Sequence, residues 1–218
     1  SQSVIVDGRI DESEWIGSAS TRLEQYGKTV EIKSKIESGI LYWAIEADTK
    51  NWLALLLKTS PHHGMVWEFT DAKLLSENGV EDYNVEYKGM MVGAGLKKDS
   101  ASTIIAQATS ETENGRIYEF SMPIQSGREG VDFQIGEYGN MAFYFGTSPI
   151  FSGQLVSDDA FSKQMVMHVG EEIHRGVLSK IIPEAIATTF GSSETESNNI
   201  IQSSKGNMST YLLIIAIA

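Results

Sequence analysis

The chain has 218 residues and is 41% hydrophobic, enough for the core of one large domain, with or without a tail. Its 17 basic and 29 acidic residues give a formal net charge of −12, which argues against nucleic acid or an anionic membrane surface as a partner. The sequence has no cysteine, which excludes disulfides, iron–sulfur clusters, cysteine-ligated zinc, covalently attached haem and thiol catalysis.

The first third of the chain contains four predicted strands. A short strand is expected at residues 4–6, before the Asp7-Gly8 turn, with Trp15 as an apolar anchor of the segment that follows. Residues 28–35 alternate in polarity, and residues 39–47 are rich in β-branched and aromatic side chains, so both predict strands. The continuous apolar run at 52–57 predicts a strand that is buried on both faces.

The middle of the chain continues the same pattern of short strands and tight turns. The Asn114-Gly115 pair is a strong hairpin signal. Further strands are expected at 83–87, 103–109, 132–135 and 141–146. Six to ten short strands separated by Gly, Asn and Asp turns predict an all-β domain over residues 1–190, with the fold of an antiparallel immunoglobulin-like β-sandwich.

The composition changes after residue 190. Residues 191–209 are rich in Ser, Asn and Glu, which predicts a polar linker. Residues 210–218 form a short apolar tail, which is too short to span a bilayer as a helix, since that takes about 20 residues. We expect the tail to be either the start of a membrane anchor or a strand that pairs with another subunit.

A histidine-rich turn at residues 61–65 separates two apolar runs, one at 52–57 and one that ends at Leu75. It reads Pro-His-His-Gly-Met and places His63 and Met65 close together. Imidazole and thioether groups are typical ligands of haem iron or copper. The alternative is structural, because Met is also a common core residue and His63 could occupy an exposed turn.

Four segments together resemble the DOMON family of extracytoplasmic β-sandwiches, whose members bind haem or sugar. They are VDGRIDESEW at 6–15, NWLALLLKTS with FTDAKLL at 51–75, ETENGRIYEFSMPIQSG at 111–127, and MAFYFG with SDDAFSKQMVMHVG at 141–170. The first is also similar to the opening of family 9 carbohydrate-binding modules. The resemblance covers residues 3–175 and depends on the order and spacing of the segments, since no single motif is specific.

The resemblance implies one non-covalent b-type haem, held by a Met from an early loop and a His from a late segment. The matching positions are Met65 and His168. Met65 lies six residues before Asp71, whereas the family usually has four or five, so His63 stays open as the early ligand. Lys163 and His174 are alternatives to His168. Apolar side chains expected to line the haem are Trp67, Phe69, Met90 and Met167.

The sequence therefore predicts an electron-transfer domain with a redox partner protein. No nucleophile elbow, H-E-x-x-H motif or strand-linked G-x-G-x-x-G occurs, so no enzymatic activity is expected. An extracytoplasmic location at the cell surface or in the medium follows from the resemblance, and from the start at Ser1, which suggests a removed signal peptide. The alternatives are a carbohydrate-binding module, with Trp43, Trp52 or Trp67 as stacking residues, and a structural subunit of a surface filament. The tail could assemble a homo-polymer in either an electron-transfer or a structural role.

Overall fold

The structure is a computed structural model that describes residues 2–25, 27–59, 68–89, 93–135, 138–155, 161–168 and 180–184. The chain divides into two units, Ser1–Glu184 and Ala185–Ala218, and the described residues all belong to the first. The polar linker and apolar tail predicted from the sequence lie outside the described residues. Among the described residues, no helix has the length and apolar character needed to cross a membrane.

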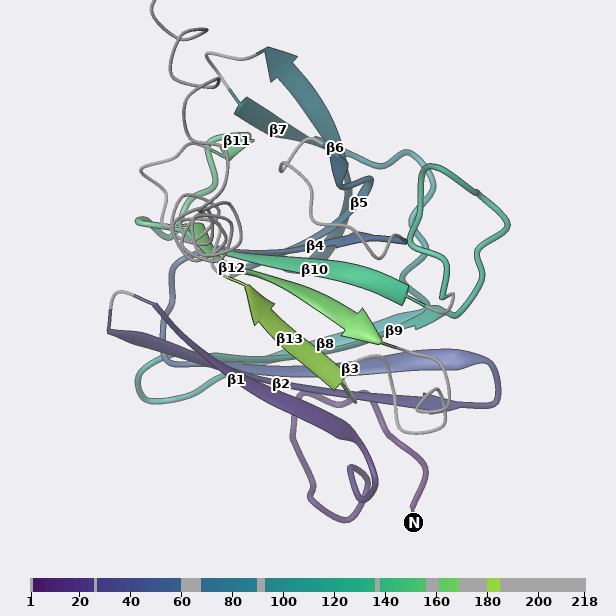
Figure 1. Cartoon of the computed structure of the whole chain (residues 1–218). Coiled ribbons are helices and arrows are strands. Elements are labelled where there is room, and N and C mark those ends of the chain that lie inside the picture. The colour runs from purple at the N-terminus through teal and green to yellow at the C-terminus, as the bar shows by residue number, and fades with distance from the viewer. Residues whose placement is uncertain are drawn as a thin grey trace, which may run out of the picture. The chain divides into compact units, whose positions relative to one another are not determined.

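The first unit is a sandwich of two antiparallel sheets (Figure 1). The five-stranded sheet has the order β1 (Ala19–Gln25), β2 (Lys28–Glu37), β3 (Ile40–Ala47), β9 (Arg116–Pro123) and β8 (Ala106–Glu111). The eight-stranded sheet has the order β11 (Gln154–Leu155), β7 (Gly93–Lys98), β6 (Gly79–Gly89), β5 (Asp71–Ser76), β4 (Leu53–Lys58), β10 (Tyr138–Phe145), β12 (Phe161–His168) and β13 (Lys180–Glu184). The predicted all-β sandwich is confirmed.

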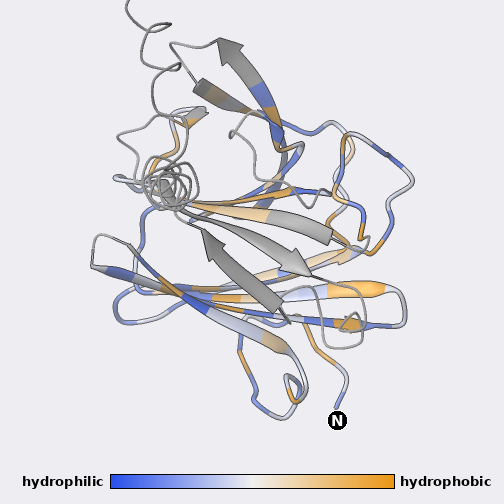
Figure 2. Ribbon diagram, in the orientation of Figure 1, coloured by the Kyte–Doolittle hydropathy of each residue, from blue (hydrophilic) through white to orange (hydrophobic). Residues whose placement is uncertain are grey.

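The main core lies between the sheets. Alternate residues of β4 and β10, such as Leu55 and Phe143, point inward and meet Trp43 and Phe120 from the first sheet. The rings of Trp43 and Phe120 stack at a centroid distance of 6.2 Å. In Figure 2 hydrophobic colours occur on strands of both sheets, and also on parts of the N-terminal segment and loops. Burial of these side chains is the main force that holds the sheets together.

The second sheet is apolar on its outer face as well. The other alternate residues of β4, β5 and β10 form a second buried layer with Trp52 and with residues of β7 and β11: Ala54, Leu56, Ala72, Leu74, Ala94, Leu96, Ala142, Tyr144 and Leu155. The predicted strand at 52–57 is therefore buried on both faces, as expected. Gly146 lies against the Trp52 ring so closely that a Cβ there would overlap the indole.

The N-terminal segment covers the outer face of the first sheet. Val4 and Trp15 pack there against Ala44 of β3, which confirms Trp15 as a core anchor. One oxygen of the buried Glu119 carboxylate, Oε2, accepts backbone hydrogen bonds from Asp7, Gly8 and Arg9 at 3.1, 2.9 and 3.2 Å.

Two predicted strands are wrong, and a third begins late. Residues 4–6 and 132–135 are not strands, because their backbone N–H groups bond to side chains or loops: Val4 donates to Glu37, and Phe133 donates to Asp71. The strand predicted at 103–109 begins only at Ala106, because the Thr103 N–H donates to the Asp82 carboxylate.

Candidate functional site

One end of the eight-stranded sheet brings together segments that are far apart in the sequence. The last residues of β4 pair with the first residues of β5 and β10, through Leu57 with Asp71 and Lys58 with Asn140. The next strand across, β12, ends at His168, which pairs with Tyr138 at the start of β10. The connection from β4 to β5 and the end of β12 therefore emerge at the same end of the sheet.

The predicted haem residues can be placed only in part. His168 and Met167 are the last two residues of β12, and Lys163 lies within the same strand. The segment 59–70, which carries His63, Met65 and Trp67 in sequence, begins and ends at the sheet end where β12 ends. The candidates that lie outside the described residues are His63, Met65, Trp67, Met90 and His174.

Phe69 and Lys58 show the environment of this end of the sheet. Phe69 is buried in the outer apolar layer. The Lys58 Nζ lies 5.4 Å from the centre of the Phe69 ring and 3.1 Å from the Glu68 carboxylate. A buried ammonium that contacts both an aromatic face and a carboxylate is stabilised by both.

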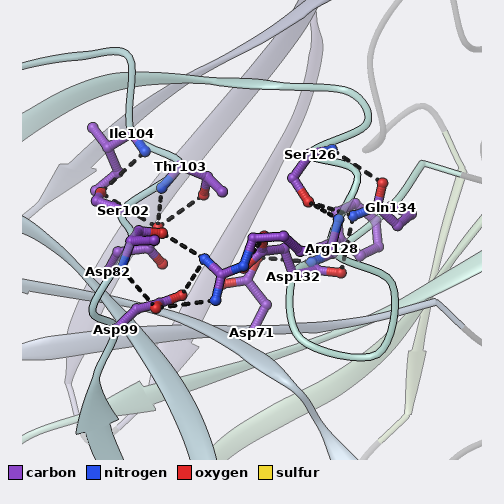
Figure 3. Close-up of polar contacts among 12 residues, drawn as sticks. Asp71, Asp82, Asp99, Ser102, Thr103, Ile104, Ser126, Arg128, Asp132 and Gln134 are labelled. Carbon is purple, nitrogen blue, oxygen red and sulfur yellow. Dashed lines mark hydrogen bonds and ion pairs between the residues drawn. The ribbon is translucent and has the colours of Figure 1, made fainter.

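A buried ionic cluster lies on the inner side of β5 and β6, next to this end. The Lys73 ammonium lies 2.6 Å from Asp71 Oδ1 and 2.5 Å from Asp82 Oδ1, and all three side chains are at most 1% exposed. Asp82 also accepts hydrogen bonds from the Thr103 N–H and hydroxyl at 2.7 and 2.8 Å, which tie the loop after β7 to the sheet (Figure 3).

Arg128 extends this network to the loop that precedes β10. Its guanidinium donates to both oxygens of Asp99, at 2.9 and 3.1 Å, and lies 3.6 Å from the Asp132 carboxylate (Figure 3). The Asp132 carboxylate is buried, and neither of its oxygens has a hydrogen-bond partner within the described part of the chain. Arg128 is therefore the cation that neutralises both acids.

The environment shifts the pKa values of this network in opposite directions. Burial raises the pKa of Asp71, although the nearby Lys73 opposes that shift. Burial alone would lower the pKa of Lys73, but Asp71 and Asp82 outweigh it and raise that pKa. Burial alone would likewise raise the pKa of Asp99, but hydrogen bonds from Arg128 hold it below its usual value.

This cluster is missing from the features that the sequence predicts. The segment FTDAKLL has the pattern of an apolar run, yet its charged residues, Asp71 and Lys73, form a pair on one strand face. That i, i+2 spacing was the available signal, because alternate residues of a strand point to the same face. Over the ranges that the structure describes, no group of three His, Asp or Glu side chains has the arrangement of a metal site.

A separate groove lies at the opposite end of β5. Its walls contain Tyr83 and Phe151, whose rings meet edge to face at 6.4 Å, and its volume is about 170 Å³. Polar groups beside them come from the turn between β5 and β6, including Asn78. Of the tryptophans predicted as stacking residues, Trp43 and Trp52 are buried and form no exposed platform, and Trp67 lies outside the described residues.

The sequence matches no protein-family model and no curated protein. Among solved structures, the fold is similar to a family 9 carbohydrate-binding module from Caldicellulosiruptor kristjanssonii in complex with cellotriose. The TM-score is 0.42 and the identity 11%, over 74% of this chain and 79% of that chain. A structure of a family 9 module from the same organism with glucose gives a TM-score of 0.42 and 12% identity, over 84% of this chain and 93% of that chain. The predicted DOMON membership stays a prediction.

Proposed function

We propose that the sandwich binds one non-covalent b-type haem at the end of the eight-stranded sheet and serves in electron transfer. The observation that carries the proposal is the strand pairing, which puts His168 at the sheet end where segment 59–70 begins and ends. In the sequence, His168 and this segment are about a hundred residues apart. A two-ligand site needs donors from two such segments.

The donor chemistry fits a haem iron. Met65 and His168 would supply a thioether and an imidazole, with His63 as the alternative early ligand and Lys163 or His174 as alternative late ligands. The chain has no cysteine, so a haem would be held by these ligands and by apolar packing. When bound, the haem would supply a one-electron couple between ferrous and ferric iron.

The chain's own residues would exclude water and set the local charge. Phe69 and the small side chains Ala72 and Ala142 belong to the outer apolar layer near this end, and an apolar lining favours a non-covalent haem. Lys58 is a buried cation beside that layer. We place Trp67, Met90 and Met167 in the same lining as part of the proposal.

The proposed setting is extracytoplasmic, at the cell surface or in the medium. The net charge of −12 favours a redox partner with a cationic docking surface. Electron transfer needs no chemistry of the domain's own, so we propose no enzymatic activity. Assembly into a polymer through the apolar tail is compatible with this function, because neighbouring haem domains would pass electrons along it.

Visible spectroscopy of the purified protein tests the proposal. We expect a Soret band, sharp α and β bands on reduction with dithionite, and haem that is extracted by acidified acetone. His168→Ala should abolish the six-coordinate spectrum, while His62→Ala, a matched change within the early segment at a position we assign no ligand role, should preserve it. Protein that stays colourless after reconstitution with haem would refute the proposal.

The early ligand needs its own pair of variants. Met65→Leu should change the spectrum if the thioether is bound, and His63→Ala should change it if ligation is by two histidines. If His168→Ala leaves the spectrum intact, Lys163→Ala and His174→Ala identify the late ligand.

A second candidate function is the binding of a saccharide in the groove beside Tyr83. The observation in its favour is the combination of aromatic rings with Asn78 and neighbouring carboxylates in a volume suited to a single sugar ring. Affinity electrophoresis in gels that contain a neutral polysaccharide tests it. Retardation that Tyr83→Ala removes and Tyr42→Ala preserves would support this function, and equal mobility with and without polysaccharide would exclude it for that polysaccharide.

A further inference from the structure

The last strand of the five-stranded sheet, β8, has a free edge, which is the side of the strand that does not pair with β9. No other described strand pairs with that side. The side chains of β8 are exposed or half-buried along its whole length. An unpaired edge presents backbone N–H and C=O groups, and an extended segment of another chain can pair with them. The free edge of β8 is therefore a candidate interaction surface.

The pairing of β8 with β9 determines which backbone groups of β8 point outward. At the end of this hairpin the Thr112 N–H donates to the Gly115 carbonyl at 3.0 Å. In an antiparallel ladder such hydrogen-bonded positions alternate with positions whose backbone groups point away from the partner strand. The register then makes Gln107, Thr109 and Glu111 the outward positions. Within the described ranges their N–H groups have no hydrogen-bond partner.

The free edge lacks the features that usually prevent such pairing. Edge strands are commonly protected by Lys or Pro residues, or by other charged side chains. β8 reads AQATSE, so it has neither Lys nor Pro, and Glu111 is its one charged residue. At the opposite edge of the same sheet, β1 carries Arg22 and Glu24, which form an ion pair at 3.3 Å. β8 is thus the less protected edge of this sheet.

A hollow of about 410 Å³ lies beside the first half of β8 and is lined by residues of both sheets. Ile105 and Gln107 line it from the first sheet, and Val80 and Lys98 line it from the second. The Ile105 side chain is apolar, yet 57% exposed. An added strand with an apolar side chain in this hollow would cover Ile105, which favours binding.

Hydrogen bonds hold the free edge and the hollow in place. The Val80 N–H donates to Gln107 Oε1 at 2.6 Å, which ties β8 to β6. The Asp82 carboxylate accepts the Thr103 N–H at 2.7 Å and so holds the loop that leads into β8 (Figure 3). A preformed surface loses less conformational entropy on binding than one that must first become ordered.

The charges near the free edge favour a cationic partner. Glu77 precedes Asn78, which lines the hollow, and Glu113 lies just beyond the end of β8. Both glutamates are exposed, and neither has an ion pair in the part of the chain that the structure describes. The whole chain carries a net charge of −12. Lys or Arg side chains that flank an apolar residue would complement this surface.

We propose that the free edge of β8 binds an extended, cationic segment of a partner protein, which adds a strand to the five-stranded sheet. An apolar side chain of that segment occupies the hollow beside Ile105, and its Lys or Arg side chains face Glu77 and Glu113. The inference does not depend on haem, because the residues of this surface lie outside the proposed haem site.

A short peptide that alternates Lys and Val, blocked at both ends, is the probe. It is titrated into the full chain labelled with nitrogen-15, and the Kd is obtained from the NMR shifts of the backbone amides. At about ten times that Kd, solvent exchange of the Gln107, Thr109 and Glu111 amides should slow about tenfold, because only the unbound fraction exchanges. The same peptide with Glu in place of Lys should bind about tenfold more weakly or less.

Two variants test the backbone edge and the hollow separately. Thr109→Pro removes one outward N–H at a type of position where an edge strand tolerates Pro, and it should abolish binding of the Lys–Val peptide. Ser20→Pro, at an exposed position of the opposite edge strand, is its control. Ile105→Ser should raise the Kd about fourfold, the effect of burying about one methylene group less. Ile5→Ser is its matched control, because Ile5 is also 57% exposed but lies in the N-terminal segment.

Several results would overturn the proposal. The first is a Lys–Val peptide that neither shifts nor protects the three outward amides, and the second is a folded Thr109→Pro variant that binds like the wild type. If Thr109→Pro does not fold, an Ile105→Ser variant that binds no more weakly than Ile5→Ser overturns it instead. Equal affinity for the Lys and Glu peptides would refute the cationic partner. Shifts of the same amides with protein concentration alone would make a second copy of the chain the occupant.

Discussion

Replacing Lys73 by methionine should be among the most damaging single changes in the sandwich. The Lys73 ammonium has two carboxylate partners, at 2.6 and 2.5 Å, and no exposed surface. Removing one partner of a buried ion pair typically costs about 3–5 kcal/mol, because the remaining charge stays buried without compensation. For a chain of this size each kcal/mol lowers the melting temperature by roughly 2–4 °C, so the variant should melt about 6–20 °C lower.

The damage in Lys73→Met should depend on pH. Burial already raises the pKa of Asp71 in the folded protein, and Lys73 opposes that rise. Without Lys73 the folded-state pKa rises further above the unfolded value of about 3.9, so the folded state binds the proton more tightly. The variant's stability should therefore increase as the pH falls through that folded-state pKa, and its deficit should be smaller at pH 5 than at pH 7.

Equilibrium unfolding in urea at both pH values measures these effects. Lys98→Met is the matched control, because Lys98 also pairs with a carboxylate, Glu81 at 2.6 Å, but is largely exposed. Its unfolding midpoint should hardly change. A Lys73→Met variant as stable as Lys98→Met, or one whose deficit grows at pH 5, would refute the reasoning.

Three further changes test other parts of the fold. Gly146→Ala should lower the free energy of thermal unfolding by about 1–3 kcal/mol, because the new methyl group overlaps the Trp52 ring. A variant as stable as the wild type would contradict that packing. Glu119→Ala should speed tryptic cleavage after Arg9, as followed by mass spectrometry, because three backbone hydrogen bonds of the N-terminal segment are lost; an unchanged rate would show that Trp15 packing suffices. Deletion of residues 208–218 should release a soluble monomer that still takes up the proposed haem. Continued sedimentation with membranes or polymers would place the contact in the sandwich.

Strands with a clear periodicity were predictable from the sequence. Residues 28–35 and 39–47 became β2 and β3, and the apolar run at 52–57 became β4 with both faces buried. The irregular structure of residues 132–135 was not predictable. Their backbone donors bond to Asp71 and Thr59 across the molecule rather than to a neighbouring strand. Local pattern carries no information about such long-range partners.

The candidate site was likewise predictable only in part from the sequence. From the sequence, His63 and Met65 are candidate ligands by their chemistry, and His168 is a candidate only through the family resemblance. That β12 ends where segment 59–70 begins and ends depends on strand order, through β10 pairing with both β4 and β12. The partner of Lys73 across the sheet, Asp82, likewise follows only from the pairing of β5 with β6.

The burial of both faces of β4 and β5 has a consequence for how these strands find each other during folding. Hydrophobic alternation normally fixes the alignment of neighbouring strands, since a shift by one residue exposes apolar side chains. Here both faces are buried, and β4 is apolar on both, so alternation alone fixes the alignment only weakly. Lys73 between Asp71 and Asp82 removes this ambiguity, because any sliding of β5 along β6 would separate an ammonium from a carboxylate inside the core. The buried charges would then disfavour a misaligned pairing of β5 with β6, although burying them costs some stability.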